Sequence, residues 1–465
     1  MKKVWYAPYK FESYGEEEIK AVEESLRSGW LGGQGPKSIE FEKAIAKRFG
    51  KKFGVFVNSG SSACLLALAA LDLLKGSKVI TPACTFSTTL APIIQLGYEP
   101  VFVDVGLNDY VAHVEDIINV VTPEVKAIML PNLIGNKPNW KLLKEQLKLI
   151  GREDIYLIED SADTLTETLE TDVATTSFYA SHVITAGGVG GMVMFNDEKH
   201  VTKCLQYRDW GRLGNDSEIM DDRFTHEVDG IPYDHKFLYS VLGYHMKCSE
   251  MNAAFGLVQL ERFKKFSQIR RDNFERYIEN LQGIGDLILP DDSIEPNWLA
   301  IPLQTEKRFE LLTFLENSNI QTRVTFAGNV TRHPVYREYL QDFENSDLKK
   351  VNFDNLQYVY SQMSDLNKQL VDTMSAFGSL PDTNLGNIKG AVGQIWIEIL
   401  KYMAEPVGVS DEKHMKAIID YRNAKKEAAA EGKKLLATPS AGKIGSVKKK
   451  PTPKLDIDMT EFKST

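Results

Sequence analysis

The segment NSGSS at residues 58–62 combines small and hydroxyl residues in a pattern that suits anion binding. It lies between an apolar run that ends at Val57 and a longer apolar run, which predicts a turn from a strand into a helix. The first N–H groups of a helix have no acceptor within it, and the helix dipole favours negative charge there. Gly60 permits close backbone approach and Ser61 adds a hydroxyl. An ordinary serine N-cap would give the same pattern, so this segment alone does not establish a phosphate site.

Other residues at strand ends suit the binding of a flat, protonated ring. Glu159 and Asp160 end the apolar run IYLIED, and a carboxylate at this edge of a sheet can pair with a pyridine nitrogen. Phe86 follows another run and could stack on such a ring, and Ser177 could give a second hydroxyl to a phosphate. Each of these residues could equally be a cap, a loop acid or a core side chain. The interpretation therefore depends on their order along the chain.

Short apolar runs that alternate with longer helical patterns connect these residues. The runs are rich in β-branched residues and bounded by turn residues, as expected for buried parallel strands. They are FGVFVNSG, SKVITPA, EPVFVDV, VKAIMLPN, IYLIED and the VMF of GGMVMF. Strands that alternate with helices predict an α/β fold whose mainly parallel sheet is covered on both faces.

The flanking segments predict further elements and a division into domains. Residues 16–50 read as two helices around the Gly-rich turn SGWLGGQGP, and residues 249–281 as a long helix leaving the main domain. Residues 285–335 alternate again, as in a small α+β domain. We expect a large domain at residues 1–260 and a small α+β domain at residues 261–347.

The C-terminal third has a different character. Apolar residues recur at three- and four-residue steps, which predicts an amphipathic helix within a helical extension at residues 348–423. They are Leu356, Val359, Met363, Leu366, Leu370, Met374 and Phe377. Residues 424–465 are rich in Lys, Ala, Pro, Gly and Ser and predict a disordered tail.

Composition limits the class of protein. The chain has 465 residues, of which 43% are hydrophobic and 26% charged, values typical of a soluble globular protein. Its net charge of -9 argues against nucleic acid as the main partner. No apolar stretch approaches the length of a membrane span. The four cysteines are scattered, which predicts neither a metal site nor disulfides and fits a cytoplasmic location.

An ordered series of motifs gives these features a common explanation. The series is NSGSSA, TFSTTLAPIIQLGYEPVFVDV, IEDSAD, SFYASHVITAGGVGG, RDWGR, YDHKFLYSVLGYHMKCSEMNAAFGLVQLERF and FAGNVTRHPVY. Between about Tyr14 and Tyr336 the chain resembles the DegT/DnrJ/EryC1/StrS aminotransferase family. Within it, the chain looks most like the nucleotide-sugar 4-keto-6-deoxyhexose 3-dehydratases. The resemblance implies the PLP-dependent transferase fold type I, as in aspartate aminotransferase.

The resemblance also implies a role for each site residue, with pyridoxal or pyridoxamine 5'-phosphate (PLP or PMP) as cofactor. Gly60, Ser61 and Ser177 would hold the phosphate, Phe86 would lie against the ring where the 3-dehydratases have Trp, and Asp160 would pair with the ring nitrogen. His245 stands where the family has an asparagine that reaches the neighbouring subunit's cofactor. Polar residues of the matched motifs would bind substrate: Arg208, Arg212, Asn329 and Arg332.

His182 stands where aminotransferases have the Schiff-base lysine and the 3-dehydratases have histidine. An imidazole cannot form the stable imine, but it can act as a general acid–base. This implies dehydration at C3 of a nucleotide-linked 4-keto-6-deoxyhexose, with glutamate regenerating the amine of the cofactor. One alternative is a sugar aminotransferase that uses another lysine, for which Lys236 is the candidate. Another is a non-catalytic scaffold whose C-terminal extension binds a partner.

Two features of the family are expected to differ here. One 3-dehydratase subclass carries an iron–sulfur cluster, but the segment after RDWGR has no cysteine, so we expect no cluster. The glycine loop at residues 187–191 lacks the acid of the family's usual G-E-G-G. Family members are generally dimers, so the resemblance implies a homodimer.

Overall fold

The computed structural model describes residues 14–214, 217, 219–290, 298–324 and 327–343. Its centre is a seven-stranded sheet in the order β1-β7-β6-β5-β4-β2-β3. The strands are β1 (Phe53–Val57), β2 (Lys78–Pro82), β3 (Glu99–Val103), β4 (Val125–Pro131), β5 (Tyr156–Asp160), β6 (Val173–Ser177) and β7 (Gly191–Phe195). The pairs formed among β2 to β6 are parallel, whereas β7 runs antiparallel to both β1 and β6.

The six predicted strands are all present, with two corrections. The run that becomes β7 was expected to be parallel, and this is wrong because β7 follows β6 through a loop, residues 178–190, that contains no crossover helix. The sequence analysis also missed β6. Its sequence, VATTS, has three polar residues, yet all five side chains are buried. A search for apolar runs does not detect a buried strand that contains several polar residues.

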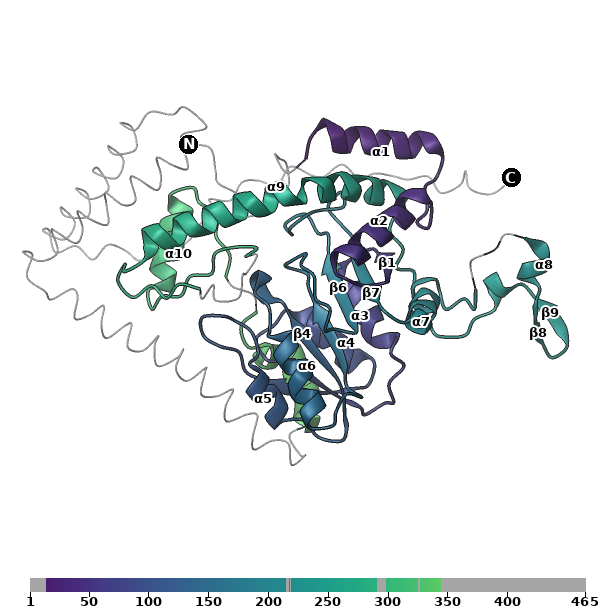
Figure 1. Ribbon diagram of the computed structural model, residues 1–465, viewed down its shortest axis with the longest axis horizontal. Helices are drawn as coiled ribbons and strands as arrows, with labels where there is room; N and C mark the ends of the chain where they lie inside the picture. Colours follow the sequence, from purple (N-terminus) through teal and green to yellow (C-terminus); the bar gives the residue numbers. More distant parts are fainter. Residues whose placement is uncertain (1–13, 215–216, 218, 291–297, 325–326, 344–465) are drawn as a thin grey trace, which may run out of the picture. The chain divides into compact units, whose positions relative to one another are not determined.

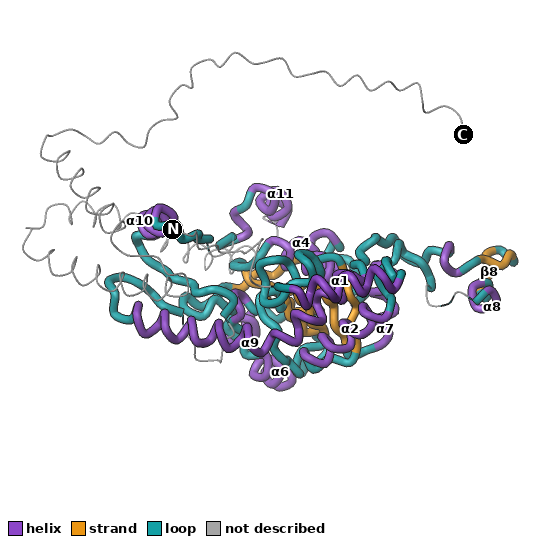
Figure 2. Tube along the Cα trace, turned by 90° about the horizontal axis from the view of Figure 1, so that it is seen from above, coloured by secondary structure: helices purple, strands orange, loops and turns teal. Residues whose placement is uncertain are grey.

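Helices cover both faces of the sheet (Figure 2). Residues of one strand alternate between the faces: Ala127 and Met129 of β4 join one apolar cluster, and Ile128 and Leu130 join another. The first face packs against α3 (Gly60–Ala69), α4 (Ser87–Gln95) and α7 (Glu198–Arg208). The second packs against α2 (Pro36–Arg48), α5 (Val114–Asn119) and α6 (Trp140–Leu149). Burial on both faces explains why the strands read as continuous apolar runs.

The two N-terminal helices and the long helix are confirmed. α1 (Glu16–Ser28) packs on α9 (Glu250–Leu281), and α2 lies between α9 and β1 (Figure 1). A Cβ at Gly256 of α9 would lie 2.6 Å from the ring of Phe41, so glycine allows α2 and α9 to cross closely. Among the described residues, no helix is long and apolar enough to cross a membrane.

A lobe that the sequence analysis did not predict follows α7. It contains α8 (Met220–Arg223), the hairpin of β8 (His226–Val228) and β9 (Ile231–Tyr233), and the 3-10 helix η2 (His235–Phe237) (Figure 1). Most of its side chains are exposed, including large apolar ones such as Met220, Ile231 and Leu242. Its strands have three residues each, too short for the period of two to be visible in the sequence.

After α9, the described residues form α10 (Arg308–Asn317), the 3-10 helix η3 (Val330–Arg332) and α11 (Pro334–Phe343). In the described part of residues 282–343, strand pairing is limited to the isolated bridges Ile288–Gln304 and Cys84–Asn329. The domain boundaries at residues 260 and 347 stay predictions. The expected helical extension at residues 348–423 and the tail at residues 424–465 lie outside the described residues.

The first residue of α9 caps another helix. The buried carboxylate of Glu250 accepts hydrogen bonds from the backbone N–H groups of Gly35 (3.0 Å), Lys37 (2.8 Å) and Ser38 (3.1 Å), at the start of α2. A carboxylate there satisfies donors that have no acceptor in the helix and complements its dipole. Glu250 therefore ties α9 to α2 and, through α2, to β1.

We expect Glu250→Ala to lower the free energy of unfolding by roughly 2–4 kcal/mol, because three N–H groups lose a charged acceptor. Urea denaturation followed by circular dichroism measures the change. Glu261→Ala, at an exposed position of the same helix, is the control and should stay within about 0.5 kcal/mol of the wild type. Equal losses in the two variants would contradict the capping role.

Candidate active site

The N-terminus of α3 and the end of β6 form one corner of the site. Ser59 caps α3 by accepting a hydrogen bond from the N–H of Ser62, and the Ser61 hydroxyl donates to Thr88 at 3.2 Å. A Cβ at Gly60 would lie 2.7 Å from Cβ of Ser177, so only glycine permits this approach. The structure thus brings Gly60, Ser61 and Ser177 together at a helix N-terminus, an arrangement that fits a phosphate group.

Asp160 lies at the end of β5 with its carboxylate buried. Thr89 of α4 donates to Oδ2 at 2.8 Å, and the N–H of Ala162 donates to Oδ1 at 3.2 Å. Burial raises the pKa of Asp160, and hydrogen bonds, of which that from Thr89 is the strongest, offset part of this effect. A protonated ring nitrogen beside the carboxylate would favour its ionised form, so the environment fits the predicted partner.

Glu159, the other acid of the pair, points to a different set of groups. Its carboxylate accepts hydrogen bonds from Asn132 (3.0 Å) and Thr168 (2.8 Å). Burial raises its pKa, while the positive charges of Lys137 and Lys51 lower it. Glu159 therefore anchors the loop that follows β5, and the structure separates the two acids that the sequence presented together.

Phe86 is the N-cap residue of α4. Its side chain is 51% exposed, and Thr88 and Thr89 of the following turn contact Ser61 and Asp160. Phe86 is thus an exposed aromatic residue at the start of the helix whose first turn contacts Ser61 and Asp160. Its stacking on a ring stays a prediction.

His182 lies in the loop between β6 and β7, and its imidazole meets the loop that follows β5. Nδ1 is 2.6 Å from the carbonyl oxygen of Ala162, which can only accept, so Nδ1 carries the proton and donates. Burial and, to a smaller extent, the charge of Arg270 lower the pKa of His182 to about 4, although the hydrogen bond to Ala162 acts in the opposite direction. At neutral pH the imidazole is therefore uncharged, with Nε2 as its basic atom.

The structure adds Asp163, which the sequence analysis did not single out. Its Oδ1 is 3.6 Å from Nδ1 of His182, and its Oδ2 accepts a hydrogen bond from the N–H of Ile134 at 2.9 Å. Burial raises the pKa of Asp163 to about 7, and the charge of Asp160 contributes. The signal in the sequence was a third acid in IEDSAD, three residues after Asp160.

The structure argues against substrate contact by Arg208. Its side chain is 2% exposed, and its guanidinium bonds to Asp209 (2.9 Å) and to the carbonyl oxygen of Phe56 (3.1 Å), with Glu42 at 3.5 Å. These contacts hold the end of α7 against β1. RDWGR matched as a motif, but the sequence could not show that its first arginine is enclosed.

Two other predicted residues surround Trp210 instead of joining the cluster of Asp160 and His182. The His245 ring stacks on Trp210 with centroids 4.5 Å apart. The guanidinium carbon of Arg212 lies 4.4 Å from the centroid of the Trp210 ring. Lys236, the alternative lysine, belongs to η2 of that lobe. Any role of these residues at a cofactor stays a prediction.

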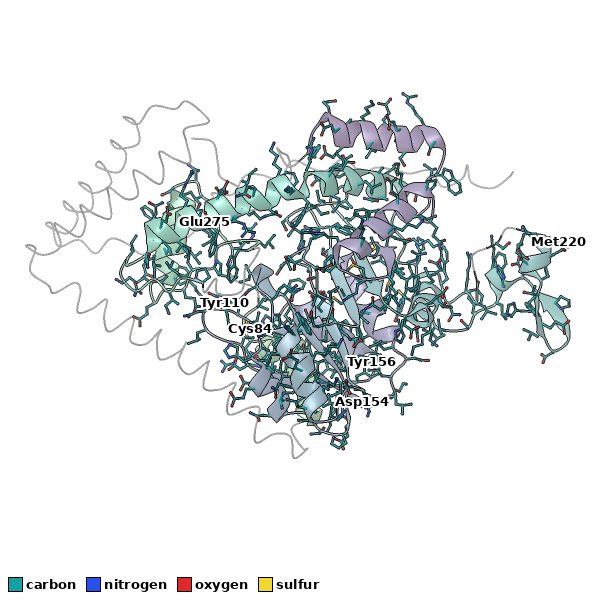
Figure 3. All side chains as sticks on the ribbon, in the orientation of Figure 1. Cys84, Tyr110, Asp154, Tyr156, Met220 and Glu275 are labelled. Carbon is teal, nitrogen blue, oxygen red and sulfur yellow. The ribbon has the colours of Figure 1, made fainter. Side chains whose placement is uncertain are left out.

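Asn329 directly precedes η3, and Arg332 is the last residue of η3. The Asn329 side chain caps η3 by accepting from the N–H of Thr331 at 3.0 Å, and its backbone bridges to Cys84, two residues before Phe86. Cys84 packs with the cluster that contains Tyr110, and Figure 3 shows the two residues close together. Arg332 is half-buried. This segment therefore lies near the start of α4, and substrate binding by either residue stays a prediction.

We expect Asp163→Asn to stabilise the protein more at pH 8 than at pH 5. A carboxyl whose pKa is raised on folding keeps its proton where the unfolded chain loses it, so stability falls as pH rises from about 4 to 7. The gain from the amide should be about 2–3 kcal/mol larger at pH 8. Urea denaturation at both pH values tests this, with Asp154→Asn, whose side chain is 51% exposed, as control. A gain that does not change with pH would refute it.

Comparison with known proteins places this site in a family. The DegT/DnrJ/EryC1/StrS aminotransferase family profile matches residues 12–356. The lipopolysaccharide biosynthesis protein RfbH of Salmonella typhimurium is 37% identical over 352 residues, which cover 69% of this chain and 79% of that protein. The dTDP-4-dehydro-2,6-dideoxy-D-glucose 3-dehydratase of Saccharopolyspora spinosa is 36% identical over 334 residues, covering 65% and 71%.

A solved structure agrees with the fold. Escherichia coli GDP-4-keto-6-deoxy-D-mannose-3-dehydratase with bound hydrated PLP has a TM-score of 0.65 and 27% identity, and the match covers 79% of this chain and all of that one. The predicted fold, PLP-dependent transferase type I, is thus confirmed, as is the predicted kinship with deoxysugar biosynthesis enzymes. This chain belongs to the DegT/DnrJ/EryC1/StrS aminotransferase family.

Proposed function

We propose that this chain is a nucleotide-sugar 3-dehydratase that works with pyridoxamine phosphate and uses His182 as its acid–base group. The observation that carries the proposal is the state of His182: a neutral imidazole, anchored through Nδ1 to Ala162 and next to the residues that fit a cofactor. An imidazole cannot hold the cofactor as an imine but can transfer protons. Relatives named as 3-dehydratases, from Saccharopolyspora spinosa and Escherichia coli, support this reaction class.

The residues of this chain would divide the work as follows. Gly60, Ser61 and Ser177 bind the phosphate, and Asp160 keeps the ring nitrogen protonated. A bound cofactor would supply an amine for the C4 ketone of a 4-keto-6-deoxyhexose and a ring that accepts electrons. His182 would be the acid–base group: its Nε2 would accept a proton beside the cofactor and donate one to the departing C3 hydroxyl, which leaves as water. The products would be the 3-deoxy-4-keto sugar, water and ammonia, and glutamate would serve as the donor that restores the amine.

A sugar aminotransferase is the second candidate. The GDP-perosamine synthase of Vibrio cholerae is 28% identical over 323 residues, so relatives of this kind are also close. This alternative needs a lysine that can form an imine, and Lys236 would have to come from the lobe of a second chain. We propose a homodimer for either reaction, since large apolar side chains of the lobe are exposed. His245, which the family resemblance places near the neighbouring subunit's cofactor, stacks on Trp210 just before the lobe.

We expect the wild type, incubated with pyridoxamine phosphate and a panel of nucleotide-linked 4-keto-6-deoxysugars, to give a product that is lighter by one oxygen atom and retains its ketone. His182→Asn should abolish turnover and leave cofactor binding within about threefold, because the amide fills the space but cannot accept a proton. Mass spectrometry of the product and a cofactor titration measure the two effects. A product that gains an amine, or a reduced lysine adduct after borohydride, would favour the aminotransferase.

We expect Asp160→Asn to weaken cofactor binding by at least tenfold, because an amide cannot stabilise a protonated ring nitrogen. The change is measured by titration of cofactor absorbance. Asp104→Asn is a matched control, since Asp104 directly follows β3 at the same edge but three strands away in the sheet. The assignment fails if both variants retain wild-type affinity.

A further inference from the structure

α9 carries an arginine on its buried face. The face that packs against the main domain includes Phe263, Phe274 and Leu281, and Arg270 lies seven residues after Phe263 and four before Phe274. These spacings place Arg270 on the same side of the helix as its apolar neighbours. A guanidinium in such a stripe must leave water, so its contacts require an explanation.

Those contacts do not explain Arg270 as a source of stability. Nη2 donates to the carbonyl oxygen of Val183 at 3.1 Å. Nη1 is buried and has no acceptor in the described part of the chain. Burial lowers the pKa of Arg270 to about 10. A buried donor without an acceptor is destabilising, and a methionine of similar length would avoid this cost.

The bond to Val183 connects α9 to the catalytic candidate, because Val183 directly follows His182. The N–H of His182 donates to the carbonyl oxygen of Tyr179 at 3.0 Å, and its imidazole donates to Ala162. Arg270 fixes the backbone on the other side of His182. Contacts from its own loop, from the loop after β5 and from α9 thus hold the histidine.

The groups that face the imidazole act on its charge in different directions. From α9, the positive charge of Arg270 disfavours a proton on His182 and adds to the effect of burial. From the loop after β5, Asp163 would favour that proton if ionised, and the carbonyl oxygen of Ala162 favours it. Tyr179 of its own loop presents a ring with its centroid 6.2 Å away. Arg270 is the cation that opposes Asp163.

We propose that Arg270 is a positioning residue that holds the carbonyl of Val183 and keeps His182 an uncharged base. The consequence for turnover rests on the proposed dehydratase function, because a base must be unprotonated before it can take a proton. The effect of Arg270 on the charge of His182 can be measured without any reaction. The charge of His182 and the consequence for turnover can therefore be tested separately.

The test is the titration of His182 by NMR in the full-length protein labelled at histidine, without substrate, with the signal assigned by its loss in His182→Asn. We expect Arg270→Met to raise the midpoint of His182 by about one pH unit, because a nearby positive charge is removed. Arg270→Lys, which keeps the charge, should stay near the wild type. Arg271→Met, at an exposed position of the same helix, is the matched control.

The pH dependence of turnover gives the second readout. The rising limb of the kcat profile should move to higher pH in Arg270→Met by the same amount, with little change in KM for the sugar. Arg270→Gln, which keeps a donor for Val183, replaces Arg270→Met if circular dichroism shows that the latter does not fold. An unchanged His182 midpoint in the neutral variants would overturn the proposal, whatever the reaction. A wild type that dehydrates no sugar would refute the proposed function and leave the titration as the test of Arg270.

Discussion

The burial of Asp160 at the end of β5 is the constraint on which the rest of the site depends. Its neighbour Glu159 is also buried, but the charges of Lys137 and Lys51 offset part of the rise that burial causes in its pKa. Neutral groups, among them the Thr89 hydroxyl and the Ala162 N–H, bond to Asp160, and burial dominates its pKa. A buried carboxylate binds a cation strongly, because folding has already removed water from it and binding adds little further cost of desolvation. The two adjacent acids therefore have different surroundings, and lysine charges act on Glu159.

The position of β5 in the sheet brings Asp160 to the catalytic candidate. β5 lies between β4 and β6, and short bonds join their ends: Asn132 N–H to the Asp160 carbonyl and Ser161 N–H to the Thr175 carbonyl, both 2.8 Å. The Thr176 hydroxyl also donates to the Ser161 carbonyl at 2.8 Å. These bonds fix the backbone that presents the Ala162 carbonyl to His182. The threonines that hid β6 from the sequence analysis are therefore part of how the site is held.

Much of this arrangement could be predicted from the sequence, because parallel strands end at one edge of a sheet and the turn residues follow them. The positions of Gly60, Ser61 and Asp160 follow from that rule, whereas Ser177 ends β6, a strand that the sequence analysis missed. Asp163 and Arg208 could not be predicted in the same way. Whether Asp163 faces His182 depends on the path of a loop, and whether Arg208 faces solvent depends on the packing of α7 against β1. A sequence motif specifies residue types, but it does not show which of their polar atoms form hydrogen bonds within the fold.

The loop after β5 is in turn held by residues distant in sequence. Ile134 has a φ of 57°, a conformation costly for a β-branched residue, and its backbone is fixed on both sides: its N–H donates to Asp163, and its carbonyl accepts from the N–H of Leu299 at 2.7 Å. Trp298, next to Leu299, stacks on Phe274 of α9 with ring centroids 5.9 Å apart.

α9 therefore reaches the candidate base by two routes. One runs from Phe274 through Trp298, Leu299 and Ile134 to Asp163, and the other from Arg270 through Val183. The first route positions an acid whose ionised form would favour a proton on His182, and the second positions a cation that disfavours it. A shift of α9 would change both contacts together, because they come from residues four apart on one face of the same helix. The charge of the imidazole is thus linked to the packing of the helix that leaves the main domain.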